Sequence, residues 1–308
     1  MTGRAHARAS ALVAPVPEHD RQIGVVRDHL VAAVAEAMAH TAPGGLVEVT
    51  GASIDGQWSN PTAPEEFRWK PAFVRRSLGL ALVRACVEGR FQAPATAAEP
   101  VVAEALDCWR QTGWRTYHWE PWLAGLAPGA RAVVLAEAVT WASALWVAFD
   151  WAALGSRCLF GAPNDLWTCP GPRTVRLKGR ADVQVVLAGD AYSLPGTSDD
   201  SQAGDRQTIG VPSEDPRCTA DTSSVALISV VSGRPGELWQ EELAFPALVA
   251  GLRWPSRPVP ARVVGLWPDA ATVRMVDIDD RLLGATSERV VAAVRRAHSE
   301  LAIGLTAA

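Results

Sequence analysis

Three charged residues on one short segment could take part in phosphate chemistry. Lys178, Arg180 and Asp182 alternate with small or apolar residues, which is the two-residue repeat of a strand. Metal-dependent hydrolysis of a phosphodiester needs at least two clustered carboxylates to hold Mg²⁺ and a cation near the attacking water. If the strand is unbroken, the three side chains share one face. Asp182 is then a candidate metal ligand and catalytic residue, and Lys178 a candidate catalytic cation.

A second strand is predicted after a polar stretch. Residues 225–231 are apolar almost throughout, as expected of a central strand covered on both faces, and they run into the turn Gly233 to Pro235. An acid on one strand, followed by a buried strand and this turn, resembles the core of the RecB-type nucleases of the PD-(D/E)XK superfamily. The segment Gly179 to Asp182 matches the family's glycine, basic residue, any residue and aspartate. The resemblance covers roughly residues 130 to 300 and implies a three-layer core around a small mixed sheet.

The catalytic residues that the resemblance implies for the second strand are missing. The family pattern has an acid, any residue and a lysine just before the turn, and this chain has Ser229 and Val231 at those degenerate positions. In the next helix many relatives have a glutamine four residues before a tyrosine, where this chain has Glu241 and Phe245. The resemblance therefore implies a catalytically degenerate nuclease-like protein. By analogy with helicase-nuclease assemblies, we expect a structural or DNA-guiding subunit in DNA repair, recombination or defence, with a helicase or nuclease subunit as partner.

An active metal-dependent deoxyribonuclease with migrated residues is the first alternative. Its centre would combine four side chains, with Mg²⁺ as the cofactor: Glu137, Asp182, Glu241 and Lys178. Glu137 lies on a long apolar helix, where a carboxylate needs either a polar cavity or an exposed position. The simpler interpretation is that Glu137 and Glu241 are solvent-exposed residues on helix surfaces without a role in a site. Without such a rearranged centre we expect no cofactor and no catalysis.

A protein-protein scaffold without DNA contact is the second alternative, and the net charge of −4 favours it. Proteins that hold duplex DNA by themselves usually have a basic excess. Local basic strips exist nevertheless, at Arg68, Lys70, Arg75 and Arg76, and at Arg173, Arg176, Lys178 and Arg180. The candidate DNA contacts are Arg176, Arg180 and Arg234. A continuous basic groove would favour DNA binding, and scattered charges would favour a scaffold.

Composition places few further limits on the chain. Its 308 residues are 48% hydrophobic and 20% charged, which is ordinary globular composition. The five cysteines lack a close pair, so we expect reduced thiols and no iron-sulfur cluster. No membrane-spanning run and no ordered signal peptide are found, so we expect a cytoplasmic protein that does not bind membranes. The oligomeric state is left open.

Hydrophobic periodicity predicts an α/β protein whose helical N-terminal part packs on the nuclease-like domain. Residues 1–17 are expected to be disordered, 18–130 to form the helical part and 131–308 the domain, with a polar insertion at 190–224. Helices are predicted at 20–40, 72–88, 99–109, 128–151, 238–252 and 279–301. Strands are predicted at 174–183, 225–231, 262–267 and 272–276.

Tryptophan is unusually frequent, with 13 residues in the chain. Four of them, Trp109, Trp114, Trp119 and Trp122, crowd around His118. We assign them first to the core, because an indole buries much area and needs only one acceptor. A partner-binding surface and a platform for stacking bases are the alternatives.

Overall fold

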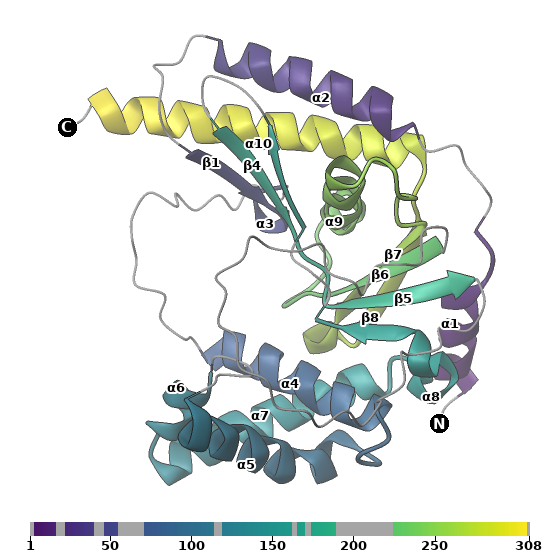
Figure 1. Ribbon diagram of the computed structural model, residues 1–308, viewed down its shortest axis with the longest axis vertical. Coiled ribbons are helices and arrows are strands. Elements are labelled where there is room, and N and C mark those ends of the chain that lie inside the picture. The colour runs from purple at the N-terminus through teal and green to yellow at the C-terminus, as the bar shows by residue number, and fades with distance from the viewer. Residues whose placement is uncertain are drawn as a thin grey trace, which may run out of the picture.

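The computed structural model describes residues 3–16, 22–39, 46–54, 71–113, 119–161, 165–169, 174–188 and 224–306. The described chain is mixed α/β, with helices on both sides of a five-stranded sheet (Figure 1). Above the sheet in this view lie α2 (Ile23–Met38), α9 (Trp239–Arg253) and α10 (Asp280–Thr306). Below it lie α4 (Pro71–Val87), α5 (Pro94–Thr112), α6 (Glu120–Ala124) and α7 (Pro128–Trp146). Five of the six predicted helices are confirmed, with ends shifted by up to five residues, and the sixth, predicted at 128–151, ends early at Trp146.

The five-stranded sheet has the order β2-β5-β6-β7-β8. Its strands are β2 (Cys158–Phe160), β5 (Val183–Ala188), β6 (Ser224–Val230), β7 (Arg262–Trp267) and β8 (Thr272–Asp277). The central pair β6 and β7 is parallel, and α9 supplies the crossover that parallel neighbours need. The other neighbours are antiparallel. The strands predicted from residues 225, 262 and 272 are confirmed, whereas the insertion predicted between β5 and β6 lies outside the described residues.

A second, three-stranded sheet has the order β1-β4-β3. Its members are β1 (Leu46–Thr50), β3 (Asp165–Cys169) and β4 (Thr174–Gly179), and β1 pairs in parallel with β4. The sequence analysis missed β1 and β3, which are only five residues long. Short strands stabilised by distant partners leave little local pattern. Because β1 pairs with β4, the N-terminal part predicted as helical contributes a strand to the second half.

The strand predicted from 174 to 183 is broken, which corrects the expectation of one shared face. The chain leaves β4 after Gly179 and enters β5, in the other sheet, at Val183. A Cβ at Gly179 would lie 2.9 Å from the Cβ of Val249, so the missing side chain lets α9 approach the strand at this point. In the linking segment Arg180 is exposed, whereas Asp182 is buried. The backbone N–H of Asp182 donates to the carbonyl of Ile228, which extends the pairing with β6.

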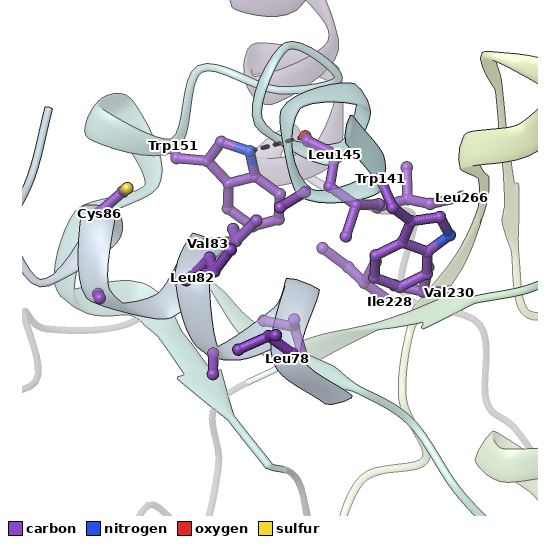
Figure 2. Packing of buried hydrophobic residues seen from close by; sticks show 14 of the residues in the cluster. Leu78, Leu82, Val83, Cys86, Trp141, Leu145, Trp151, Ile228, Val230 and Leu266 are labelled. Carbon is purple, nitrogen blue, oxygen red and sulfur yellow. Dashed lines mark hydrogen bonds between the residues drawn. The ribbon is translucent and has the colours of Figure 1, made fainter. Parts of the chain in front are cut away.

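The helices below the larger sheet enclose one hydrophobic core. Figure 2 shows the ring of Trp141 on α7 beside Ile228 and Val230 of the sheet, with Leu78 and Leu82 of α4 in the same core. The helices α4 and α7 approach closely where Gly79 faces the ring of Trp141, because a Cβ there would come within 2.4 Å of that ring. Of the four clustered tryptophans, Trp119 belongs to this core and Trp109 and Trp122 are partly buried against it, as their first interpretation expected, and Trp141 and Trp151 are buried here as well. Trp114 and His118 lie outside the described residues.

A second core lies on the opposite face of the larger sheet. It joins α9 and α10 to the buried side of β1 and β4, through Val47, Val175 and Leu177. The helix α2 adds Leu30, Val34 and Met38, which recur at helical spacing. Residues 22–39 and 46–54 therefore pack with the C-terminal half of the chain. Phe245 and Leu248 on α9 are fully buried at the centre of this layer.

Residues 3–13 form a helix, α1 (Gly3–Val13), where the sequence predicted disorder. Its buried residues are Ala5, Ala9 and Leu12, so its core face is built mostly from small side chains that carry little hydrophobic pattern. Its last turn is held by Arg262 of β7, which is 6% exposed. The guanidinium Nη1 donates to the carbonyls of three residues: Ala11 at 2.5 Å, Leu12 at 2.8 Å and Ala14 at 3.2 Å. The last carbonyls of an α-helix lack the i+4 partner that the others have, so Arg262 acts as a distant cap for the C-terminal end of α1.

The long helix predicted at 128–151 is two helices. The helix α7 ends at Trp146, and α8 (Trp151–Leu154) follows with the 3₁₀ turn η1 (Gly155–Arg157), at an angle of 64°. The Nε1 of Trp151 donates to the carbonyl of Leu145 at 3.0 Å, and Asp150 caps α8 at Ala153. No single described helix is long and apolar enough to cross a membrane, although the two bent segments reach that length and composition together.

Candidate functional site

A cleft of about 310 Å³ opens where the two sheets meet. It lies at the carboxyl ends of strands from both sheets: Thr50 ends β1, Lys178 is the penultimate residue of β4, and Ser229 and Val230 end β6. Ligands of open α/β sheets bind in the crevice outside the carboxyl ends of the strands. The position of this cleft therefore marks it as the candidate site.

Three further elements complete the walls. The first two turns of α9 contribute Glu242, Leu243, Phe245 and Pro246, α4 contributes Arg76 from the opposite side of the sheet, and the short helix α3 (Gly51–Ile54) contributes Gly51 and Ala52. The remaining lining residues are Arg180, Val231 and Ser232. The cleft is thus lined by residues from both helical layers and both sheets.

Asp182 lies beside the cleft with its carboxylate held by protein donors. Its side chain is 1% exposed. The Nη2 of Arg76 lies 2.8 Å from Oδ1 and 2.7 Å from Oδ2, and the backbone N–H of Val230 donates to Oδ2 at 2.7 Å. A buried carboxylate needs such a cation and such donors to offset its lost hydration. Asp182 therefore forms an ion pair with Arg76 of α4 and accepts a hydrogen bond from the end of β6.

Three cations converge on the cleft, namely Arg76, Lys178 and Arg180. Burial and then repulsion from Arg76 lower the pKa of the Arg180 guanidinium, and attraction from Asp182 partly opposes them. Arginine remains charged at neutral pH under such a shift. The Arg180 side chain is 58% exposed, with its Nε 4.0 Å from Asp182, so a ligand in solution can reach it. Against these cations, the described lining contains one carboxylate, that of Glu242.

The residues around Asp182 do not fit the Mg²⁺ that the nuclease resemblance implies for an active enzyme. Both carboxylate oxygens of Asp182 face Arg76, whose positive charge stands where a metal ion would have to sit. Ser229 and Val231 line the cleft, and neither brings a carboxylate. Within the described ranges, no group of three or more His, Cys, Asp or Glu side chains could hold a metal ion.

The structure does not bring the four residues of the hypothetical rearranged centre together. Glu137 is exposed on α7 and does not line the cleft. On α9 the lining acid is Glu242, one residue after the predicted Glu241. Lys178 and Asp182 do lie at the cleft, but on opposite sides of the break between β4 and β5. Of the predicted DNA contacts, Arg180 lines the cleft, Arg176 is half-buried on β4 and Arg234 is exposed.

The turn Gly233 to Pro235 is tied to the neighbouring elements. The backbone N–H of Gly233, which has φ = 81°, donates to Oδ2 of Asp269 at 3.0 Å. Asp269 lies in the 3₁₀ turn η3 (Pro268–Ala270), and its Oδ1 lies 3.7 Å from Nη2 of Arg75. Consecutive arginines on α4 therefore engage two acids, Asp269 and Asp182. These contacts fix the first turns of α4 at one end of the larger sheet.

Sequence reasoning identified Arg76 as part of a basic strip but not as the partner of Asp182. The two residues are 106 positions apart, so no local spacing connects them. The available signal was a pair of arginines, Arg75 and Arg76, near the start of a mostly apolar helix. A cation at such a position requires either solvent or an acid.

We compared the chain with protein-family models, with curated proteins and with solved structures, and found no match in any of the three comparisons. No family is shown. The resemblance to the PD-(D/E)XK nucleases therefore rests on the residues themselves.

Proposed function

We propose that the protein is a catalytically degenerate, RecB-type nuclease-like protein that holds DNA in the cleft without cutting it. The observation that carries the proposal is the ion pair between Arg76 and Asp182. It neutralises the carboxylate that the resemblance assigns to metal binding, while the cleft keeps its cations. In this proposal the protein serves as a structural or DNA-guiding subunit in DNA repair, recombination or defence, beside a helicase or nuclease subunit.

The residues that line the cleft support the loss of phosphodiester hydrolysis, because they lack the ligands that the metal ion needs. A Mg²⁺ ion in a phosphodiesterase is bound by one or two carboxylates together with waters and substrate phosphates. Asp182 would first have to give up Arg76, at a cost of several kcal/mol for a buried ion. Ser229 lies where the family has an acid, and it cannot replace that charge.

The same lining supports retention of DNA contact. Arg76 meets Asp182 through Nη2, and within the described part of the chain its buried Nε has no hydrogen-bond partner. A guanidinium whose N–H groups are not all used within the protein can donate hydrogen bonds to the oxygens of a phosphate in this basic cleft. The three cations converge on one site, which favours DNA over the scaffold alternative. The net charge of −4 limits the affinity and agrees with a subunit that binds DNA beside a partner.

Calorimetry with Mg²⁺ and Mn²⁺, run beside cleavage assays on single-stranded and duplex DNA, tests the loss of catalysis. The matched variant is Asp182→Asn, which keeps an acceptor for the Val230 N–H. We expect no metal heat and no cleavage from either protein. Cleavage by the wild type that needs metal and disappears in Asp182→Asn would establish the active alternative instead.

DNA binding is tested by fluorescence anisotropy with labelled DNA, comparing the wild type with Arg180→Gln. Arg180 is exposed, so its replacement should leave the fold intact. We expect weaker binding and a shallower dependence on salt. Undetectable binding by the wild type, even at low salt, would support the scaffold alternative.

A further inference from the structure

We infer that the cleft and the strand leading into it bind a single DNA strand in preference to a duplex. This inference rests on the proposed DNA-guiding function and names the form of DNA. The feature that carries it is a row of cations formed by Arg176 and Lys178 of β4 and by Arg180, which follows directly after the strand.

The row follows from the repeat of a strand. Arg176 and Lys178 lie on the face of β4 opposite the buried Val175 and Leu177, and Arg180 follows at the end. Side chains two residues apart on a strand are separated by about 6.6 Å. This spacing suits successive phosphates of one extended backbone. The row ends in the cleft, where Arg76 adds a fourth cation from α4.

The strands on either side of β4 do not offer a second row. In the sheet register Glu48 and Thr50 of β1 lie beside Arg176 and Lys178. On the other side, Thr168 of β3 is opposite Arg176. These neighbours are an acid and two hydroxyls, on the face that carries the cations. The described residues of β1 and β3 on this face therefore offer no cation to the second backbone of a duplex, and Glu48 would repel it.

An exposed apolar residue lies beside the row. Leu166 of β3 is directly opposite Lys178 and is 40% exposed. A single strand has unpaired bases that can lie on such a surface, whereas the bases of a duplex are stacked and paired. A phosphate on Lys178 would bring a neighbouring base to Leu166. The cleft volume of about 310 Å³ is at the lower end of the range for small-ligand sites, which suits one nucleotide rather than a turn of duplex.

The test is fluorescence anisotropy with a labelled single strand of mixed sequence and with its duplex, between about 50 and 200 mM salt. We expect the single strand to bind about tenfold more tightly than the duplex. Lys178→Gln should weaken binding and reduce the slope of log affinity against log salt by about 0.7, the value for one lost phosphate contact on a single strand. Leu166→Gln should weaken binding of the single strand without changing the slope.

The control variant is Arg289→Gln, because Arg289 is an exposed cation on α10 outside the cleft lining. It should bind like the wild type. A duplex bound as tightly as the single strand, with a loss on Lys178→Gln, would overturn this inference and leave the proposed function standing. Binding of neither form would overturn the proposed function itself. A single strand whose affinity is unchanged by both Lys178→Gln and Leu166→Gln would show that this face is not the site.

Discussion

The guanidinium of Arg76 on α4 contacts both carboxylate oxygens of Asp182, at 2.8 and 2.7 Å, across 106 positions of sequence. Arg76 belongs to the helical layer below the larger sheet, and it also lines the cleft where the two sheets meet. The contact therefore joins the lower helices to the candidate site. It also provides the positive charge that makes Asp182 a structural anion in the proposed function.

Removing Arg76 alone should be more harmful than removing the charges of both partners. Arg76→Leu leaves Asp182 buried without its cation, and we expect a loss of about 3 kcal/mol in the free energy of unfolding. The double variant Arg76→Leu with Asp182→Asn should recover most of that loss, because the amide oxygen still accepts from the Val230 N–H. Urea unfolding of both single variants and the double variant measures the coupling. Additive losses would show that the two side chains do not depend on each other.

Replacing Gly79 by alanine should destabilise the protein, whereas the same replacement at Gly284 should not. A Cβ at Gly79 would lie 2.4 Å from Trp141, so Gly79→Ala forces α4 and α7 apart or reorients the ring. Overpacking of this kind costs about 1 to 3 kcal/mol. The matched control is Gly284→Ala on α10, where nothing lies within 4 Å of the new Cβ and the better helix propensity should stabilise by up to about 1 kcal/mol. Thermal unfolding should therefore move in opposite directions for the two variants.

The elements that the sequence predicted are those whose pattern is local. In α2 the buried Leu30, Val34 and Met38 recur at helical spacing, and β6 is a continuous apolar run. By contrast, α1 has only a weak hydrophobic pattern. Two of its buried residues, Ala5 and Ala9, have small side chains that are hardly hydrophobic. Its C-terminal cap comes from Arg262, about 250 positions away. Such a helix depends on tertiary contacts that a window of sequence does not contain.

The candidate site was predictable only where its residues are close together in the sequence. Lys178, Arg180 and Asp182 were found because they are close in sequence, and all three lie at the cleft or beside it. The prediction that they share one face was wrong, because the chain passes from one sheet to the other after Gly179. Asp182 is buried there, whereas Arg180 stays exposed. The partner Arg76 was assigned only to a basic strip, since the pairing depends on how α4 packs on the sheet.

Arg262 should hold α1 in place. Arg262→Gln removes the donor to the carbonyls of Ala11 and Leu12 in α1 and of Ala14 just after it, together with the ion pair with Asp277, whose Oδ1 lies 2.5 Å from Nε. Because Arg262 is 6% exposed, we expect a loss of about 3 kcal/mol. Asp277→Asn is the control, since Asp277 is 45% exposed and its charge should contribute less than about 1 kcal/mol. Amide hydrogen exchange in α1 should speed up in Arg262→Gln alone, and unchanged exchange there would refute the capping role.

Asp165 should make stability fall as pH rises above about 4. Burial raises the pKa of this carboxyl, although Arg253 at 3.2 Å and the Trp254 indole N–H at 3.4 Å oppose the shift. A raised folded-state pKa means that the folded chain holds the proton after the unfolded chain has lost it, at an ordinary pKa of about 3.9. The contribution of Asp165 to stability is therefore complete below that pH and is lost as pH rises through its folded-state pKa.

The variant that isolates this effect is Asp165→Asn, whose amide oxygen can still accept from Trp254 and Arg253. Urea unfolding of the variant and the wild type across the acidic range should give curves that separate as pH rises, with the variant the more stable at neutral pH. Below about pH 4 the two proteins should converge. A wild type more stable than Asp165→Asn at neutral pH would mean that the ion pair with Arg253 outweighs the desolvation of the carboxylate, because only that attraction is lost in the variant.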